Sequence, residues 1–304
     1  MQKMCLGTVQ FGMNYGINNE IKRQPTIEES IEMIDIAVNN GIDVIDTARA
    51  YGNAELVLGE YFKKHQGNKK IKVISKLRPN VIENKECDIE SVIVREIEDS
   101  LIRIGIEKLD GYLLHTPEYI YDERIVKALL RVKERGYTNN IGVSIYNLKE
   151  GFEAIRIGDI DYIQLPYSIL DQRGKKDNFI DMAKKNNIEI YTRSAFLQGL
   201  FMMDKSKIPE HLKKAIPYMN RIEHIIEKYD IDLIDAILGF VKSEENIDYL
   251  VFGVETKKQL LEDLYRYNNA KIDQRCITEL KSEITDIDDS IILPSLWSNG
   301  KKAE

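Results

Sequence analysis

The sequence is poor in the residues that cross-link small domains or bind metal ions. Among 304 residues it has three cysteines and four histidines. Cys5, Cys87 and Cys276 are odd in number, far apart and without the spacing of metal ligands. We therefore expect reduced thiols in a cytoplasmic protein, no disulfide framework and no metal site.

The sequence also lacks a long apolar run and a block of basic residues. Its N-terminus, MQKMCLGTVQFG, has no apolar signal-peptide core, and no stretch elsewhere approaches the length of a membrane span. The net charge is −7, with lysine and arginine interspersed among aspartate and glutamate. We expect neither a membrane nor a nucleic acid as a partner.

What the chain does contain is a regular alternation of two signals. Short β-branched runs predict strands, and the longer segments between them, such as residues 27–40 and 88–105, have helical periodicity. The predicted strands are residues 5–9, 42–46, 71–75, 109–114, 139–143, 161–165, 188–192 and 248–252. Helix-start patterns occur at Thr26-x-x-Glu29, Asn147-x-x-Glu150 and Thr256-x-x-Gln259, and glycines that stop helices at Gly41, Gly105 and Gly136.

About eight strands alternating with about eight helices predict parallel strands joined by crossover helices. This number favours an α/β fold of the (β/α)8 TIM-barrel type over an open doubly wound sheet, and no G-x-G-x-x-G turn follows the first strand. No linker rich in serine, glycine and proline divides the chain, so we expect one domain over residues 1–304. An extra helix near residues 210–229 interrupts the alternation after the seventh strand, and further helical residues are expected at the C-terminus.

Three consecutive predicted strands end on residues that can carry chemistry. The second strand ends at Asp46 and is followed by Tyr51, the third ends at Lys76 and the fourth at His115. Alone, each has an ordinary explanation as a cap, a solvated lysine or a hydrogen-bonded core histidine. In a barrel the carboxyl ends of the strands meet at one active-site mouth, so their joint occurrence predicts a site.

The four side chains suit proton donation to a carbonyl oxygen. A phenol, with a pKa near ~10, is too weak an acid to donate readily at neutral pH, and a nearby ammonium lowers that pKa by about 1–3 units. We therefore expect Asp46 to hold Lys76, Lys76 to lower the pKa of Tyr51, and His115 to bind the substrate oxygen. A hydrolytic triad or a zinc site is not indicated.

On these residues the sequence resembles the aldo-keto reductase superfamily over nearly its whole length. The run Asp46-Thr47-Ala48-Arg49-Ala50-Tyr51-Gly52 matches a family pattern, and Ser75-Lys76, Leu114-His115, Glu55 and Gly59 match others. The resemblance implies a barrel that reduces an aldehyde or ketone to an alcohol with NAD(P)H. It also implies that Asp46, Tyr51, Lys76 and His115 are catalytic, with Tyr51 as the general acid and base.

The resemblance further implies a set of cofactor contacts. Members of the set are Gly7, Thr8, Ser144, Gln164, Arg193, Gly253, Thr256, Lys257 and Gln259. Several positions depart from the family: Ile145 replaces an asparagine, Arg193 replaces the tyrosine that stacks on the nicotinamide, Gly253-Val254 replaces Lys-Ser, and Gln259 replaces an arginine. Family habit favours NADP(H), with Lys257 and Lys258 as the source of positive charge, whereas Glu255 would repel a phosphate. NAD(H) therefore stays open.

The resemblance leaves the substrate and two other functions open. Loop aromatics expected near the mouth are Phe11, Tyr15, Tyr119, Tyr121, Tyr146, Phe196 and the tail at Leu296-Trp297. The excess of tyrosine over phenylalanine, 16 against 8, suggests a small, sugar-like carbonyl compound. The alternatives are a cofactor-binding regulatory homologue with little turnover and a lyase or aldolase that uses Lys76 as a Schiff-base amine.

Relatives usually begin with a hairpin, which is here expected to be short or absent. A monomer or weak homodimer is the default assembly.

Overall fold

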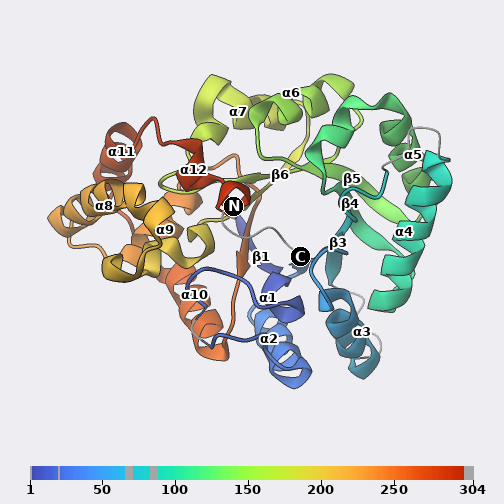
Figure 1. Ribbon diagram of the computed structural model, residues 1–304, viewed down its shortest axis with the longest axis horizontal. Coiled ribbons are helices and arrows are strands. Elements are labelled where there is room, and N and C mark those ends of the chain that lie inside the picture. The colour runs from blue at the N-terminus through green and yellow to red at the C-terminus, as the bar shows by residue number, and fades with distance from the viewer. Residues whose placement is uncertain (1, 20, 66–70, 83–87, 298–304) are drawn as a thin grey trace.

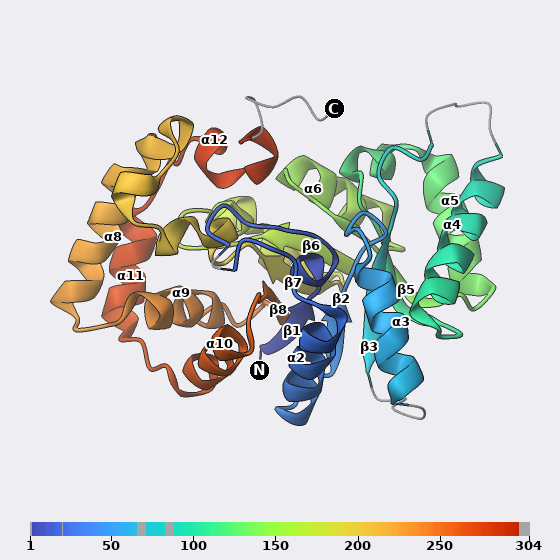
Figure 2. The ribbon, with the colours of Figure 1, turned by 60° about the horizontal axis from the view of Figure 1, so that its bottom comes forward.

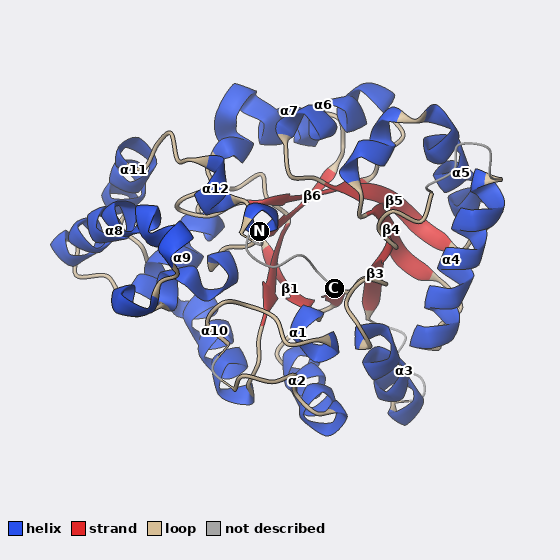
Figure 3. Cartoon of the chain, in the orientation of Figure 1, coloured by secondary structure: helices blue, strands red, loops and turns tan. Residues whose placement is uncertain are grey.

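The computed structural model describes residues 2–19, 21–65, 71–82 and 88–297. Eight parallel strands close into a barrel in sequence order, β1 to β8, and the helices surround them (Figures 1 and 3). The strands are β1 Lys3–Gly7, β2 Val44–Asp46, β3 Lys72–Leu77, β4 Leu109–Leu114, β5 Thr138–Ser144, β6 Tyr162–Pro166, β7 Glu189–Arg193 and β8 Tyr249–Gly253. The predicted (β/α)8 barrel is confirmed.

One or more helices follow each strand and cover the outer face of the barrel. The helices before β7 are α1 Val9–Gly12, α2 Ile27–Asn39, α3 Ala54–Lys64, α4 Ile89–Ile104, η1 Pro117–Tyr121, α5 Glu123–Glu134, α6 Leu148–Ile157, η2 Arg173–Asn178 and α7 Phe179–Lys185. Their ends follow local chemistry: Thr26 and Glu29 form the expected capping box at the start of α2, and Gly105 ends α4 in the left-handed conformation at φ 73°.

The additions to the regular barrel lie where they were expected, after β7 and after β8. The segment after β7 holds η3 Leu197–Met202, η4 Lys205–Lys207, η5 Glu210–Ala215, α8 Ile216–Lys228 and α9 Leu233–Lys242, and α10 Lys257–Asn269, α11 Gln274–Glu283, α12 Asp289–Ile292 and η6 Pro294–Leu296 follow β8. The predicted helix at 210–229 is divided into η5 and α8. Helix α8 packs on α9 and α11, and these helices widen one side of the molecule (Figure 2).

Strand register explains which side chains enter the barrel. Gly7 pairs with Asp46, Asp46 with Ile74, and Lys76 with Leu113. Because side chains alternate between the two faces of a strand, every second residue along β1–β8 belongs to the interior. The inward series ends at the carboxyl end on Asp46 in β2 and Lys76 in β3.

The lower part of the barrel interior is filled by a separate hydrophobic cluster. It contains Cys5, Val44, Ile74, Leu113, Tyr162, Tyr191 and Tyr249. The rings of Tyr191 and Tyr249 stack with centroids 4.7 Å apart, and Tyr162 lies 5.1 Å from Tyr191. β1 begins at Lys3, so within the described residues no hairpin precedes it. Tyr162 and Tyr249 are the first residues of β6 and β8, so the tyrosine cluster lies toward the amino ends of the strands.

Several details differ from the sequence predictions. β1 ends at Gly7, because Val9 begins the short helix α1 instead of ending a strand. Cys5 and Cys276 are free and buried, as expected, whereas Cys87 lies outside the described residues. In the described part of the chain, no helix combines the length and the apolar character needed to cross a bilayer.

Candidate active site

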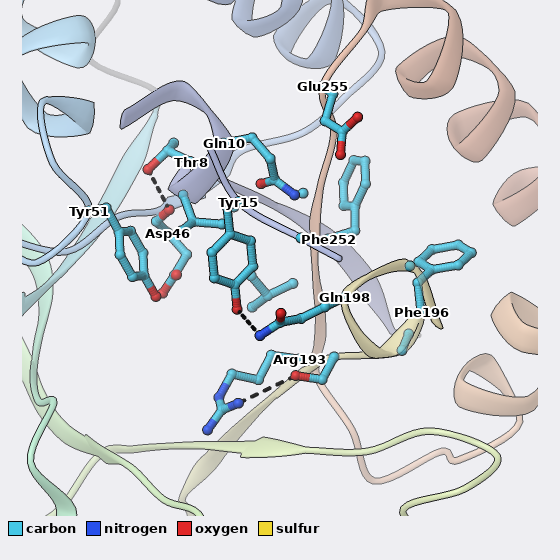
Figure 4. Close-up of a pocket in the computed structure, with 18 of the residues that line it drawn as sticks. Thr8, Gln10, Tyr15, Asp46, Tyr51, Arg193, Phe196, Gln198, Phe252 and Glu255 are labelled. Atoms are coloured by element: carbon cyan, nitrogen blue, oxygen red, sulfur yellow. Dashed lines mark hydrogen bonds between the residues drawn. The ribbon is translucent and has the colours of Figure 1, made fainter. Parts of the chain in front are cut away.

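A cavity of about 590 Å³ lies at the carboxyl ends of the strands. One part, here the catalytic end, is lined by Asp46, Tyr51, His115, Ser144 and Arg193. The opposite part, here the acidic end, is lined by Glu255, Glu262 and Asp263. In Figure 4 Tyr51 and Asp46 lie on one side of the cavity and Glu255 on the other.

A buried ion pair forms the base of the catalytic end. Lys76 is 0% and Asp46 2% exposed. The Lys76 ammonium donates to Asp46 Oδ1 and Oδ2, both at 2.7 Å, and to the carbonyl of Thr47 at 2.8 Å. All three ammonium protons therefore have acceptors, which offsets the large cost of burying the charge. Burial lowers the pKa of Lys76, and Asp46 opposes that shift.

Neighbouring strand ends hold the Asp46 carboxylate in place. Gln164 donates to Asp46 Oδ1 at 2.8 Å and accepts from Ser144 at 3.2 Å. Thr8 donates from its hydroxyl to the Asp46 carbonyl at 3.1 Å. Gln164 on β6 and Lys76 on β3 contact the carboxylate directly. Ser144 on β5 holds Gln164, and Thr8 after β1 holds the Asp46 backbone. Ser144 and Thr8 line the cavity, whereas Gln164 lies behind it.

Tyr51 is placed by a close contact between two backbone segments. Gly52 has φ +55°, and a Cβ atom on Gly12 would lie 1.7 Å from the Tyr51 carbonyl. The amide of Asn53 donates to the carbonyl of Gly12 at 3.3 Å. Glycine at positions 12 and 52 is therefore what lets α1 and the loop after β2 pack closely enough to fix Tyr51.

The Tyr51 ring lies against the other members of the predicted set. The Lys76 ammonium is 5.1 Å from the centroid of the ring, and His115 makes an edge-to-face contact with centroids 5.7 Å apart. The structure thus brings Asp46, Tyr51, Lys76 and His115 together at one end of the cavity. Three of them line it and Lys76 supports them from below.

The pKa of Tyr51 moves in the direction opposite to the one predicted. Burial raises it first and the Asp46 carboxylate raises it further, while Arg193 lowers it. The Lys76 ammonium lies over the ring face and its protons are bonded to Asp46 and Thr47, so none of them reaches the Tyr51 hydroxyl to stabilise a phenolate. The prediction of a lowered pKa is therefore wrong, and Tyr51 holds its proton over the whole neutral range.

His115 is a neutral imidazole. Burial lowers its pKa to about 3, and the positive charges of Lys76 and Arg193 act in the same direction. Its Nδ1 atom is buried and has no hydrogen-bond partner within the described residues. A neutral imidazole with a free nitrogen beside a phenol suits a polar group on a substrate.

Arg193 occupies the end of β7 and faces the cavity. Its guanidinium donates to the Ile145 carbonyl at 3.1 Å and to the Ser194 hydroxyl at 3.4 Å. The guanidinium carbon lies 4.6 Å from the centroid of the Tyr146 ring, a stacking arrangement. Arg193 is therefore held rigidly by backbone, hydroxyl and aromatic contacts.

The expected contacts at β8 and α10 divide into two groups. Gly253 and Gln259 line the cavity, as does Gly7 on the neighbouring strand. Thr256 caps α10 by accepting from the Gln259 amide at 3.2 Å, and does not line the cavity. Lys257 forms an ion pair with Glu32 on α2, at the exposed surface. The lysine expected to attract a phosphate therefore points away from the cavity.

The loop aromatics that were expected near the mouth also divide into residues that line the cavity and residues that do not. Tyr15, Tyr146 and Phe196 line the cavity, and the Tyr15 hydroxyl accepts from Gln198 at 2.8 Å (Figure 4). Burial is the main cause that raises the pKa of Tyr15 to about 12. The other candidates lie elsewhere: Phe11 and Trp297 are in the core, the Tyr119 hydroxyl accepts from the Ile82 amide, and Tyr121 and Leu296 are exposed.

Sequence reasoning missed part of the site. Gln10, Glu262 and Asp263 line the cavity and were not singled out. Burial and the neighbouring Glu262 raise the pKa of Asp263 to about 7. A signal was available for the acidic residues, because positions 255, 259, 262 and 263 share one face at the start of a predicted helix.

The geometry disfavours the Schiff-base alternative. An amine that forms a Schiff base must reach the substrate carbonyl with a free lone pair. The Lys76 ammonium is buried, donates to three acceptors and does not line the cavity. Fold and site together define a (β/α)8 barrel with a phenol, a neutral imidazole and a buried ion pair at its mouth, a class equipped for proton transfer.

The chain belongs to the Aldo/keto reductase family, whose model matches residues 3–284. It is 25% identical over 300 residues to the "NADH-specific methylglyoxal reductase" of Escherichia coli (strain K12), covering 88% of this chain and 90% of the relative. The "Aldo-keto reductase YhdN" of Bacillus subtilis (strain 168) is 23% identical, with 84% and 85% covered. The solved "aldo-keto reductase AKR11C1 from Bacillus halodurans (holo form)" shares the fold, with a TM-score of 0.75, 16% identity and 95% of each chain covered. The protein is thus an oxidoreductase of this family.

Proposed function

We propose that the protein reduces a small aldehyde or ketone to an alcohol with a nicotinamide dinucleotide, and that Tyr51 donates the proton to the carbonyl oxygen. The observation that carries this proposal is the contact of Tyr51 with both His115 and Lys76 at the wall of the cavity. The family of the chain supports the same chemistry.

The cavity fits a dinucleotide. Its volume of about 590 Å³ is within the usual range of cofactor sites, and it extends from the catalytic end to α10. The side-chain oxygen of Gln10 is buried in its wall without a hydrogen-bond partner among the described residues, which is an acceptor left for a ligand. The residues that would hold the cofactor are Gly7, Thr8, Ser144, Arg193, Gly253 and Gln259, which line the cavity, and Gln164 would support Ser144 from behind. When bound, the nicotinamide supplies the hydride for the carbonyl carbon.

The chain's own residues supply the remaining chemistry. Tyr51 keeps its proton until an alkoxide, a far stronger base than a phenolate, develops on the substrate oxygen. His115 donates a hydrogen bond to the same oxygen as a neutral imidazole. Asp46 and Lys76 fix the base of the site, and burial excludes water from it.

We further propose NADH as the preferred cofactor, in place of the NADP(H) that family habit suggests. A 2′-phosphate adds negative charge, and the acidic end presents Glu255, Glu262 and Asp263 to the cavity. Lys257, one of the two lysines expected to supply positive charge, is paired with Glu32. The E. coli relative, which is described as NADH-specific, supports the same preference.

The substrate proposal is a small polar carbonyl compound. The hydroxyls of Tyr15 and Tyr146 and the amide of Gln198 are at the mouth of the cavity, next to the catalytic end. Two relatives are described as an "NADH-specific methylglyoxal reductase" and a "Pyridoxal 4-dehydrogenase". Methylglyoxal, pyridoxal and open-chain sugars are therefore the compounds to test first.

The test combines binding with turnover. Dissociation constants of NADH and NADPH are measured by quenching of protein fluorescence, and carbonyl-dependent oxidation of each cofactor is followed by absorbance with the same compounds. We expect tighter binding of NADH and turnover with at least one aldehyde. Failure to bind either cofactor would refute the proposal, and binding without turnover of any carbonyl would favour the regulatory alternative.

A further inference from the structure

Arg193 is a cation without a carboxylate partner in the part of the chain that the structure describes. Its guanidinium contacts the neutral groups of Ile145, Ser194 and Tyr146. Most buried or half-buried arginines are neutralised by an acid, because an unpaired charge costs solvation free energy. The positive charge that these contacts hold in place therefore faces the cavity without local compensation.

The charges of the other groups at the catalytic end cancel or are absent. Asp46 and Lys76 neutralise each other in their ion pair. His115 is neutral at physiological pH because its pKa is about 3, and Tyr51 keeps its proton. The acidic side chains of the cavity are at its opposite end, on the loop after β8 and on α10. Arg193 therefore sets the net charge of the catalytic end at about one positive unit.

The influence of Arg193 is concentrated at the catalytic end. Its charge lowers the pKa of Tyr51 and Tyr15 and contributes to the lowered pKa of His115. The causes that shift the pKa of Asp263 are burial, Glu262 and Arg266, and Arg193 is not among them. Arg193 thus acts on groups around the reacting atoms and not on the acidic end.

The position of the nicotinamide ring follows from the positions of the proton donors in the cavity wall. Tyr51 lies in the loop after β2 and His115 directly follows β4, so the substrate carbonyl must contact that side. The cofactor ring must approach the carbonyl carbon from the remaining wall, where Ser144, Tyr146 and Arg193 project from β5, its following loop and β7. The dinucleotide then extends along β8 toward α10.

A nicotinamide ring at this position differs in charge between its two redox states. The oxidised ring is a pyridinium cation, whereas the reduced dihydropyridine is neutral. We propose that Arg193 selects the charge state of the cofactor, binding NADH and repelling NAD⁺, so that the site favours carbonyl reduction. This inference rests on the function proposed above and extends it to the cofactor's redox state.

The selection acts on affinity and leaves the overall equilibrium of the reaction unchanged. A guanidinium close to a pyridinium raises the dissociation constant of NAD⁺, while its flat face stacks favourably on the neutral ring. We therefore expect weak product inhibition by NAD⁺ and a high KM for NAD⁺ in alcohol oxidation. The charge on Arg193 produces this effect.

The experiment compares the two dissociation constants in the full chain by isothermal titration calorimetry. We expect wild type to bind NADH at least about tenfold more tightly than NAD⁺. Arg193→Gln removes the charge. The ratio of the NAD⁺ to the NADH dissociation constant then falls by about tenfold or more, mainly because NAD⁺ binds more tightly. Arg193→Lys keeps the charge and therefore most of the preference for NADH over NAD⁺. Glu255→Gln is the matched control, because it changes a charge at the acidic end, where it affects both redox states equally.

Each outcome has a definite meaning. A wild-type ratio near one overturns the inference without any variant, and so does an unchanged ratio in a folded Arg193→Gln protein. Arg193→Met is a second neutral variant if the glutamine disturbs the contact with Tyr146. Failure of wild type to bind either redox state refutes the proposed function instead, so the two failures are distinguishable.

Discussion

The two ends of the cavity are built on different kinds of scaffold. At the catalytic end the functional side chains project from strand ends and are braced by one another, as the Lys76–Asp46–Gln164–Ser144 chain of hydrogen bonds shows. At the acidic end Glu255, Glu262 and Asp263 come from a loop and the first turns of α10. Strand register fixes the first set, whereas the second set depends on helix packing. We therefore propose that the chemistry belongs to the end braced by strands, and cofactor choice to the end formed by the loop after β8 and α10.

The largest expected effect is the loss of the proton donor at the catalytic end. Tyr51→Phe removes one oxygen from a site that is otherwise intact, so turnover falls about 10²- to 10⁴-fold. The dissociation constant of NADH stays within about twofold, because the ring and its contacts remain. Steady-state kinetics and fluorescence titration check both values. Tyr121→Phe, at a side chain that is 53% exposed, is the matched control and keeps full activity. Full turnover in Tyr51→Phe would contradict its role.

Breaking the ion pair beneath the catalytic end tests its structural role. Lys76→Met leaves Asp46 buried and charged, so the free energy of unfolding falls by about 3–5 kcal/mol. The double variant Asp46→Asn with Lys76→Met regains much of that stability without regaining activity. Urea unfolding measures the stability. Lys3→Met, which breaks an exposed pair with Asp43, costs at most about 1 kcal/mol. Equal losses for the buried and the exposed pair would show that burial does not matter here.

Reversing one charge tests whether the acidic end sets the preference for NADH over NADPH. Glu255→Lys replaces a repulsive charge with an attractive one, and NADPH binding improves about tenfold relative to NADH at low salt. The gain shrinks as ionic strength rises. Lys257→Met leaves the ratio of the two dissociation constants unchanged, because Lys257 pairs with Glu32. If Lys257→Met weakens NADPH binding instead, the side chain reaches the cofactor and the assignment is wrong.

The smallest expected effect concerns the pH dependence of stability at the acidic end. The folded-state pKa of Asp263, about 7, lies above the ordinary value of 3.8. Between these values the folded chain keeps a proton that the unfolded chain releases, so this group lowers the free energy of unfolding as pH rises. In Asp263→Asn that decrease is smaller by about 1–2 kcal/mol between pH 4 and pH 8.

The check is denaturant unfolding of wild type and Asp263→Asn at several pH values. Glu262→Gln provides a graded control, because its charge contributes to the raised pKa of Asp263. It should reduce the pH dependence in part. Identical pH profiles in all three proteins would mean that Asp263 titrates normally.

Sequence reasoning predicted the catalytic end better than the acidic end for a physical reason. The period of two along a strand and the parallel arrangement place Asp46, Lys76 and His115 at one mouth once the strands are recognised. The surroundings of Lys257 depend on α2, which is more than 200 residues away in the chain. The proposals for single-domain organisation and for a monomer or weak homodimer stay predictions.

The tyrosine content is a second feature whose meaning depends on contacts that the sequence does not show. An excess of tyrosine suggested a hydrogen-bonding substrate, yet Tyr162, Tyr191 and Tyr249 fill the barrel interior below the site. Composition counts side chains without saying which of them meet. Among the tyrosines in the described part of the chain, Tyr15, Tyr51 and Tyr146 line the cavity.

The sequence by itself determined the barrel, the four residues that meet at its mouth and the family. These follow from local periodicity and from a motif within a few residues. The tertiary structure alone decided that the pKa of Tyr51 is raised, that Lys257 pairs with Glu32, and that Arg193 faces the cavity with no acidic partner among the described residues. Each of these depends on burial and on charged groups from distant elements, and those groups come together only when the chain folds.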